Sequence, residues 1–347
     1  MTTTARIAIL GASGYTGAEL IRHLYGHPHI QIAALTADRK AGMKMADVFP
    51  HLAHVPLPNL TALDEVNWAE IDVVFGCLPH GVMHDLVRKI PENVKVIDLS
   101  ADFRLADAEV YKEWYGREHT ALDLQKEAVY GIPEINRVAI SKARIVAGPG
   151  CYPTSAQIPL SPLLSAGLIA TDSIIIDAKS GVSGAGRATR EGLLHTEVSE
   201  GFNAYGVAGH RHAPEIEQGL TRAAGSPIMV TFTPHLLPMN RGILTTIYVS
   251  LVEGTSADDL RTHLQKHYEG APFVKILPRG KQPATRHVRG TNMLLISVDA
   301  DRVPGRAIII AAEDNLVKGA SGQLVQCMNV MMGWPETTGL SQIALFP

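Results

Sequence analysis

Cysteine is scarce in this chain of 347 residues, which contains only Cys77, Cys151 and Cys327. The three form no CxxC pair, and their odd number does not make a disulfide framework, so the disulfide-rich secreted class is excluded. Cysteines that stay reduced are typical of proteins in a reducing compartment. We therefore expect a cytoplasmic protein without disulfides.

Long apolar runs and clusters of basic residues are also absent. No run approaches the roughly 18 apolar residues of a membrane-spanning helix. The first ten residues, MTTTARIAIL, lack a basic region followed by a long apolar stretch, so a secretory signal is not expected. The formal net charge is −3, from 31 lysines and arginines against 34 aspartates and glutamates. Neither a membrane nor a nucleic acid is therefore an expected partner.

The chain is long enough for two domains, since 347 residues exceed the size that a single hydrophobic core usually reaches. In its first part, short β-branched runs alternate with longer amphipathic stretches. The expected strands cover residues 6–10, 30–36, 72–78, 94–100 and 144–148, and the expected helices cover 16–26 and 82–90. This alternation predicts an α/β fold, a Rossmann-type doubly wound parallel sheet, over residues 1–149.

Residues 150–317 show a different pattern, with frequent strands and few helices. The expected strands cover 173–180, 228–238, 243–252, 274–278, 292–301 and 306–314, and the helices cover 214–224 and 256–269. We expect an α+β catalytic and dimerisation domain whose mixed or antiparallel sheet is covered on one face. The C-terminal segment 318–347 begins with a strongly apolar helix over 318–332, which we expect to pack back on the first domain.

A glycine-rich loop, ILGASGYTGAEL, joins the first expected strand to the first expected helix. Glycines at this position permit a tight turn and let backbone N–H groups approach a pyrophosphate at the helix N-terminus. A turn that binds no ligand is the alternative, but the strand–loop–helix context favours a dinucleotide site. The candidate cofactor-binding residues of this loop are Gly11, Ser13, Gly14, Tyr15, Thr16 and Gly17.

The end of the second strand indicates which nicotinamide cofactor is bound. An NAD site usually has an acidic residue there, which binds the ribose 2′-hydroxyl. Here Thr36 is followed by ADRKAG, so Asp38 lies at about the right distance, but Arg39 and Lys40 beside it suit a 2′-phosphate. The balance favours NADP(H), with Arg39 as a candidate ligand, although both cations also fit an ordinary solvated loop.

Cys151 follows an expected strand through a Pro-Gly turn in the sequence AGPGCYPTSAQIP, and we expect a helix to begin after it. Unpaired N–H groups and the positive end of a helix dipole favour a thiolate at such a position. Nucleophilic catalysis also needs a base nearby, and GHRH supplies His210 and His212. Since cysteine is often buried and inert, local features leave both interpretations of Cys151 open. No cysteine or carboxylate at ligand spacing completes a metal site with the two histidines, so no metal is expected.

Seven segments together resemble the N-acetyl-γ-glutamyl-phosphate reductase family, within the semialdehyde dehydrogenase superfamily. They are LGASGYTGAEL, DLSADFRL, YGIPEINR, VAGPGCYPTSAQIPL, SGVSGAGR, GHRHAPEIEQ and EDNLVKGASGQ, and they extend over nearly the whole chain. One small departure is Ser155, where the family more often has glycine or alanine. A sister reductase acting on an N-acylated aminoadipyl phosphate shares these motifs, and aspartate-semialdehyde dehydrogenase shares the glycine motif, so both are alternatives.

The resemblance implies NADPH-dependent reduction of N-acetyl-γ-glutamyl phosphate to the semialdehyde in arginine biosynthesis, with release of inorganic phosphate. It implies a thioester on Cys151 and acid–base catalysis by His210, with His212 as a second candidate for the proton. A cysteine hydrolase or acyltransferase, and a catalytically silent NADP-sensing regulator, are competing functions.

The substrate carries a carboxylate and a phosphate, which call for cationic partners. The candidate substrate-binding residues are Arg104, Arg187, Arg211 and His212. Each arginine fits a structural ion pair equally well. Further cofactor contacts are expected at Ser180 and Gly181, in a glycine-rich segment suited to a mobile loop, and at Asn315. A homodimer or homotetramer is the expected assembly.

Overall fold

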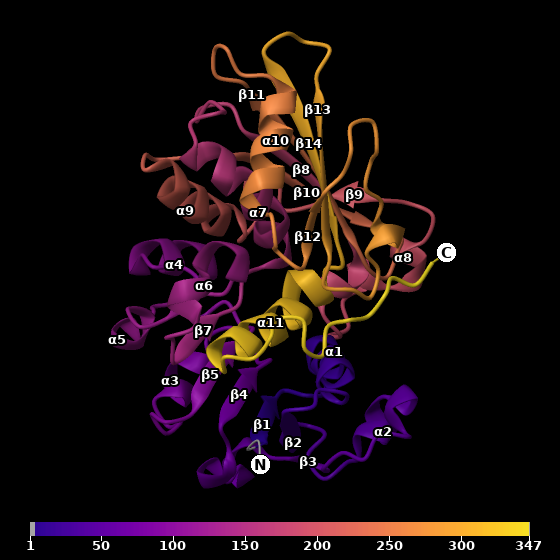
Figure 1. The fold of residues 1–347 in the computed structure, drawn as a ribbon. Coiled ribbons are helices and arrows are strands. Elements are labelled where there is room, and N and C mark those ends of the chain that lie inside the picture. Colours follow the sequence, from indigo (N-terminus) through magenta and orange to yellow (C-terminus); the bar gives the residue numbers. More distant parts are fainter. Residues whose placement is uncertain (1–3, 347) are drawn as a thin grey trace. The chain divides into compact units, whose positions relative to one another are not determined.

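The computed structural model describes residues 4–346, which divide into two compact units. The first unit contains the described residues up to Pro149 together with Ala320–Ser341, and the second contains Gly150–Gly319 together with the residues from Gln342 onward. Each unit is built around its own seven-stranded sheet (Figure 1).

The sheet of the first unit is entirely parallel, in the order β3-β2-β1-β4-β5-β7-β6. Its strands are β1 (Ala5–Leu10), β2 (Ile30–Thr36), β3 (Leu60–Thr61), β4 (Val73–Gly76), β5 (Lys95–Asp98), β6 (Val129–Tyr130) and β7 (Ile145–Ala147). Central strands of a parallel sheet are buried on both faces, and β4 and β7 are accordingly apolar and buried, while β1 is buried except at Arg6. The predicted Rossmann-type sheet is confirmed.

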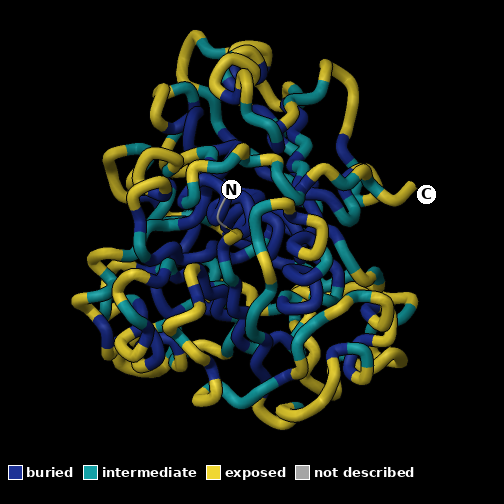
Figure 2. Tube along the Cα trace, turned by 60° about the horizontal axis from the view of Figure 1, so that its bottom comes forward, coloured by how far each residue is buried: buried dark blue, intermediate teal, exposed yellow. Residues whose placement is uncertain are grey.

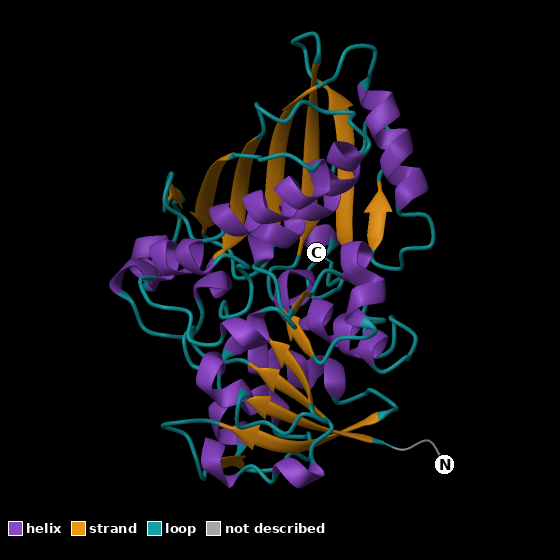
Figure 3. Cartoon of the chain, turned by 90° about the vertical axis from the view of Figure 1, so that its left-hand side faces the viewer, coloured by secondary structure: helices purple, strands orange, loops and turns teal. Residues whose placement is uncertain are grey.

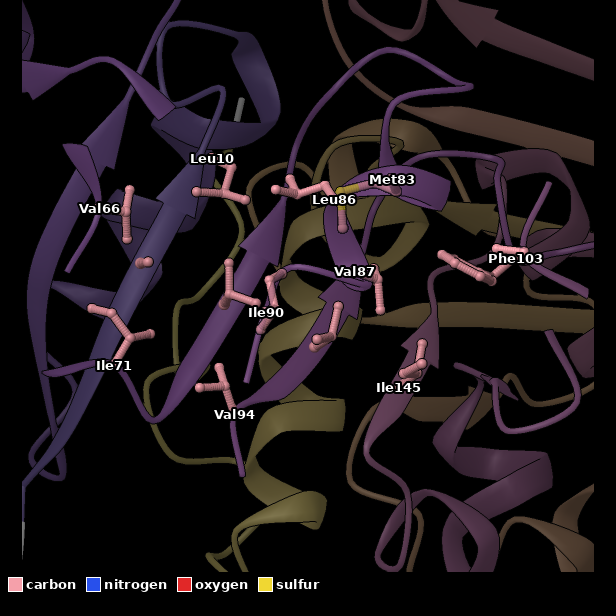
Figure 4. Packing of buried hydrophobic residues seen from close by; sticks show 14 of the residues in the cluster. Leu10, Val66, Ile71, Met83, Leu86, Val87, Ile90, Val94, Phe103 and Ile145 are labelled. Atoms are coloured by element: carbon pink, nitrogen blue, oxygen red, sulfur yellow. The ribbon is translucent and has the colours of Figure 1, made fainter. Parts of the chain in front are cut away.

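Amphipathic helices supply the rest of the first unit. They are α1 (Tyr15–Leu24), α2 (Met45–Val48), α3 (Met83–Val87), α4 (Ala108–Tyr115), α5 (Leu122–Gln125), α6 (Pro133–Ile140) and α11 (Gly322–Met331). One core cluster joins Met83 and Leu86 of α3 to Leu10 of β1 and Ile145 of β7 (Figure 4). Each such side chain contributes roughly 1.5–3 kcal/mol by leaving water. Because the strands run parallel, their carboxyl ends, and the loops that follow them, meet at one edge of the sheet.

The sheet of the second unit is mixed, in the order β12-β13-β14-β11-β8-β10-β9. Its strands are β8 (Ile175–Gly181), β9 (Asn203–Ala204), β10 (Thr231–Leu237), β11 (Ile243–Ser250), β12 (Val274–Ile276), β13 (Leu294–Ala300) and β14 (Arg306–Glu313). The β8–β10 and β12–β13 pairs are parallel and the other neighbours are antiparallel, which confirms the prediction of a mixed sheet.

Helices cover one face of this second sheet (Figure 3). They are α7 (Cys151–Ser165) and α10 (Ala257–His267), which contact the strands, and α9 (Ala213–Ala224), which packs on α7. Side chains along β11 alternate between buried and half-buried, as expected for a strand with one covered and one open face. The short helix α8 (His195–Val198) lies in a largely exposed stretch of chain. Figure 2 colours the described chain by burial, with many of the exposed residues in its outer loops.

The C-terminal segment differs in detail from the expected helix over 318–332. A π-helical turn, η7 (Val317–Ser321), comes first, and α11 follows it. α11 packs on α1 and α6 of the first unit, whereas the residues from Gln342 onward belong to the second unit. No helix within residues 4–346 is long and apolar enough to cross a membrane.

Candidate active site

The glycine loop after β1 has the geometry that a dinucleotide site requires. Gly11 has a φ of +73°, and a β-carbon there would lie 2.5 Å from the carbonyl oxygen of Cys77. A β-carbon on Gly17 would lie 2.6 Å from the backbone of Ala12, so the start of α1 packs closely on the loop. Gly14, the N-cap of α1, has no side chain to cap the helix, which leaves first-turn N–H groups to a ligand. The residues present therefore fit a bound pyrophosphate.

The other candidate residues of this loop have different surroundings. Tyr15 is exposed, Ser13 is half-buried, and the Thr16 hydroxyl hydrogen-bonds to the Cys77 thiol. At the end of β2, the Thr36 hydroxyl accepts a hydrogen bond of 3.3 Å from the Gly11 N–H, which fixes the loop to the second strand. Arg39 lies just beyond this point and is exposed. Its guanidinium is accessible to a ligand bound at this edge of the sheet.

Cys151 is the first residue of α7 and follows the N-cap residue Gly150. Because the residues at a helix N-terminus have backbone N–H groups without helical partners, a thiolate is favoured there. The other two cysteines have different environments. Burial raises the pKa of the Cys77 thiol to about 12, and the buried Cys327 thiol donates to the carbonyl oxygen of Gly131. Cys151 thus differs from the other two cysteines in its place at a helix N-terminus, whereas Cys77 and Cys327 are hydrogen-bonded within the first unit.

The N-terminus of α9 lies against the turn that carries Cys151. His212 is the N-cap of α9, and a methyl group on Gly150 would overlap the His212 ring. Glu215, in the first turn of α9, is buried, and its Oε1 accepts a hydrogen bond of 2.8 Å from the Gly150 N–H. The Gln157 side chain of α7 donates to the Glu215 carbonyl oxygen at 3.1 Å. These contacts bring His212 next to the nucleophile turn.

His210 is held in an aromatic cage beside His212. Its ring lies 4.7–5.6 Å, centroid to centroid, from the rings of His212, Tyr205, Phe232 and Tyr152. Burial, with a contribution from the Arg211 charge, lowers the pKa of His210 to about 4. Its Nδ1 accepts a hydrogen bond of 3.1 Å from the His212 N–H. His210 is therefore neutral at pH 7, with its proton on Nε2, and acts as a hydrogen-bond donor from that atom.

Two phenols complete this side of the site. The hydroxyls of Tyr152 and Tyr205 lie 3.1 Å apart, and Tyr152 donates to the carbonyl oxygen of His235 at 3.2 Å. Burial raises the pKa of Tyr205 to about 12 and also raises the pKa of Tyr152. Both phenols therefore remain protonated around neutral pH.

Asn315 holds the glycine-rich segment that follows β8. Its amide nitrogen donates to the Ser183 hydroxyl at 2.9 Å, and its amide oxygen accepts from the Gly242 N–H at 2.8 Å. Ser180 is buried, with its hydroxyl donating to the Gly181 carbonyl oxygen at 3.0 Å. The predicted cofactor residues Ser180, Gly181 and Asn315 are thus neighbours in the second unit, and Asn315 determines the position of the loop.

The three candidate substrate arginines are not gathered into one cluster. Arg104 belongs to the first unit, where it donates to the carbonyl oxygens of Gly148 at 2.7 Å and Leu99 at 3.2 Å. Arg187 and Arg211 belong to the second unit and are exposed. Within residues 4–346, no group of three or more histidine, cysteine, aspartate or glutamate side chains is placed to hold a metal ion.

Sequence reasoning did not identify Glu215 or Tyr205. A signal for Glu215 is present, since it comes three residues after the N-cap His212 with Pro214 between them, a pattern typical of a helix start. Tyr205 has no local signal. It enters the site because its N–H donates to the carbonyl oxygen of Pro234 in β10, a residue distant in the sequence.

Two family models match the chain. Residues 6–143 match "Semialdehyde dehydrogenase, NAD binding domain", and residues 151–315 match "Semialdehyde dehydrogenase, dimerisation domain".

Curated relatives match over nearly the full length. The N-acetyl-gamma-glutamyl-phosphate reductase of Rhodospirillum rubrum is 60% identical, with 100% of both chains covered. A protein of Arabidopsis thaliana named "Probable N-acetyl-gamma-glutamyl-phosphate reductase, chloroplastic" is 55% identical over 99% of this chain and 85% of its own.

Solved structures share the fold at low identity. Aspartate semialdehyde dehydrogenase II of Vibrio cholerae has a TM-score of 0.74 at 16% identity, covering 95% of this chain and 99% of its own. The aspartate semialdehyde dehydrogenase of Candida albicans, solved with NADP, has a TM-score of 0.71 at 18% identity with the same coverage.

Proposed function

The chain belongs to the N-acetyl-γ-glutamyl-phosphate reductases, a family of semialdehyde dehydrogenases, and from this premise we propose how its own residues carry out the reaction. The enzyme reduces N-acetyl-γ-glutamyl phosphate to N-acetylglutamate 5-semialdehyde with NADP(H) and releases phosphate, a step of arginine biosynthesis. The observation that carries the mechanism is the position of Cys151 at the start of α7, with His212 and Glu215 against the preceding residue.

The first step is attack by the Cys151 sulfur on the acyl carbon of the substrate. A carbon–sulfur bond forms, and inorganic phosphate leaves with the electron pair of the broken carbon–oxygen bond. The thiol must lose its proton as it attacks, and the His212 ring lies against the adjacent Gly150. We assign the proton to His212. The hydrogen bond from the Gly150 N–H to Glu215 holds the start of α7 against the start of α9.

His210 has a separate task. A group with a pKa of about 4 is a weak base at neutral pH, and its Nδ1 is already engaged by the His212 N–H. Its Nε2–H is suited to donate to the carbonyl oxygen of the substrate, where negative charge develops in both halves of the reaction. When bound, NADPH supplies the hydride that reduces the Cys151 thioester. The collapsing intermediate then releases the semialdehyde, and His212 returns its proton to Cys151.

The two units divide the binding tasks in this proposal. The first unit, with the loop of Gly11, Gly14 and Gly17, holds the cofactor, while the second carries the catalytic residues and the subunit interface. Arg187 and Arg211 are exposed guanidinium groups suited to the phosphate and carboxylate of the substrate. Arg104 is the third candidate for these anionic groups, and its Nε donates to the Gly148 carbonyl oxygen, next to the turn before Cys151.

A homo-oligomer, either a dimer or a tetramer, fits the open face of the second sheet. Leu244 and Tyr248 of β11 and Ile310 of β14 are half-buried on this face, whereas the residues between them are buried under the helices. Apolar side chains on an open face are typical of subunit contacts. We also propose a cytoplasmic location, since all three cysteines carry thiols rather than disulfides.

One steady-state assay tests the proposed substrate. Phosphate-dependent NADP⁺ reduction is measured with N-acetylglutamate semialdehyde, with its homologue longer by one carbon, and with aspartate semialdehyde. We expect kcat/KM to be highest for the first, with a preference over the longer homologue of at least about tenfold, because one methylene in a fitted pocket has that effect. Equal or better turnover of the homologue would assign the chain to the sister reductases instead.

The preference for NADP over NAD is expected to depend on Arg39. Its exposed guanidinium follows Thr36 at the cofactor edge of the first sheet. Arg39→Ala should weaken NADPH binding by about tenfold or more, since a hydrogen bond to a charged group contributes roughly 1.5–3 kcal/mol. NADH binding should stay unchanged. Isothermal titration with both nucleotides measures the effect, and Arg302→Ala, at an exposed arginine of the second unit, is the matched control.

A further inference from the structure

Glu313 is a buried acid that the mechanism above does not use. It is the last residue of β14, opposite Ile243 of β11, and its exposed fraction is 0%. Burying a carboxyl group costs free energy, so such groups are retained where the surroundings compensate them or where they serve the chemistry of a site. The question is therefore which groups surround Glu313.

Gly319 shows that the side chains of Glu313 and Cys151 pack against the same point of the backbone. A β-carbon on Gly319 would lie 2.7 Å from Cβ of Cys151 and 2.8 Å from Oε1 of Glu313. The carboxyl oxygen and the cysteine side chain therefore pack against the same backbone carbon. Gly319 lies in the π-helical turn η7, with its N–H bound to the Asp314 carbonyl oxygen at 3.0 Å. Single π turns occur frequently at functional sites, where they displace the backbone from a regular helix.

A buried cation accompanies the buried acid. Lys318, also in η7, has an exposed fraction of 0%, and its Nζ lies 5.9 Å from the centroid of the Phe273 ring. A positive charge in the same part of the interior offsets the cost of an ionised carboxylate. Lys318 directly precedes Gly319 in this turn, so a buried lysine and the buried Glu313 belong to the same region of the second unit.

We propose that Glu313 is a positioning residue for the nucleophile, whose buried carboxylate raises the proton affinity of the Cys151 thiol. The inference rests on the proposed function, in which Cys151 is the nucleophile. The other titratable groups of the second unit around this residue are Tyr152, Tyr205, His210, His212, Glu215 and Lys318. The N-terminus of α7 and the Lys318 ammonium favour the ionised form of Cys151, whereas the Glu313 carboxylate disfavours it.

The charge of Glu313 changes the reactivity of Cys151 in two ways. A thiolate of higher basicity is a stronger nucleophile, with a sensitivity of about 0.4–0.5 in the logarithm of the rate per unit of thiol pKa. A thiol that stays protonated before substrate binds also resists oxidation and adventitious alkylation. Glu313 thus makes the resting thiol less reactive and the attacking thiolate more reactive.

The test follows alkylation of Cys151 by iodoacetamide from pH 5 to pH 10, with the Cys151 peptide quantified by mass spectrometry in the full chain. Glu313→Gln keeps the shape and removes the charge. The midpoint of the rate profile should fall by about one pH unit, while the limiting rate at high pH falls roughly threefold. If Glu313 only fills space, its replacement would not lower both the pH midpoint and the limiting rate of alkylation.

Glu217→Gln is the matched control, because Glu217 is a half-buried acid of α9 whose Oε1 accepts from the Val230 N–H away from Cys151. Its midpoint should equal that of the unaltered protein. If Glu313→Gln does not fold, Glu313→Asp replaces it as the test. Its carboxylate lies farther from Cys151 by one methylene, so the pH midpoint of alkylation should fall by a smaller amount. An unchanged midpoint in the folded variant overturns the proposal. Because alkylation requires no turnover, this outcome is distinct from a failure of the reductase assay.

Discussion

Cys151→Ser is expected to abolish phosphate-dependent reduction of NADP⁺ by N-acetylglutamate semialdehyde, with a loss of more than about 10⁴-fold in kcat. The serine oxygen is similar in size but is a far weaker nucleophile at neutral pH, because a hydroxyl is scarcely ionised where a thiol is partly so. Without the thioester, the acyl group has no covalent intermediate in which it has lost phosphate and can accept the hydride. Steady-state rates measured beside the unaltered enzyme give the effect directly.

Two controls make this result specific. Binding of NADP should be unchanged in Cys151→Ser, since the glycine loop belongs to the other unit. Cys77→Ser and Cys327→Ser should retain activity, because both thiols are in the first unit and are held by internal contacts with Thr16 and Gly131. Near-normal turnover in Cys151→Ser would contradict the thioester route.

His212→Gln is expected to cause the second large loss, about 10²–10⁴-fold in kcat/KM, which is the usual contribution of a general base. Glutamine fills much of the space of the ring but cannot accept the thiol proton. The structure places the His212 ring against Gly150, so alkylation of Cys151 at pH 7 should slow as well.

His210→Gln provides the comparison that ranks the two histidines. His210 is neutral and donates from Nε2, so its loss should lower kcat without slowing alkylation of Cys151. Rapid-quench measurement of alkylation in both variants separates the roles. Slow alkylation in His210→Gln, with a normal rate in His212→Gln, would reverse the assignment.

The fold could be predicted from the sequence wherever one element carries a strong local pattern. The β-branched runs at 6–10 and 306–314 became β1 and β14 within one residue at each end. The two-residue strands β3, β6 and β9 were not foreseen, because their pairing depends on neighbouring strands rather than on their own side chains. The length of α7 was not foreseen either.

α7 illustrates how tertiary structure overrides a local rule. It runs for 15 residues through Pro159 and Pro162, each of which removes a helical N–H donor. Most of the helix is buried between α9, α10 and the sheet, and that packing offsets the lost hydrogen bonds.

The candidate site was predictable only in part, for the same reason. The position of Cys151 after Pro-Gly marks it as a candidate nucleophile, but local features alone also allow an inert buried thiol. The contact of Glu215 with Gly150 and that of Gly319 with Cys151 each join residues far apart in the chain, so no local pattern shows that Glu215 and Glu313 lie near the nucleophile.

The division of the chain has a consequence for its synthesis. α11 closes the first unit by packing on α1 and α6, yet in the sequence it comes after the whole sheet of the second unit. During synthesis, the apolar surface of α1 and α6 that α11 covers stays exposed while the second unit is translated. We therefore expect residues 1–149, produced alone, to aggregate, and the first unit to complete its folding only once α11 has been made.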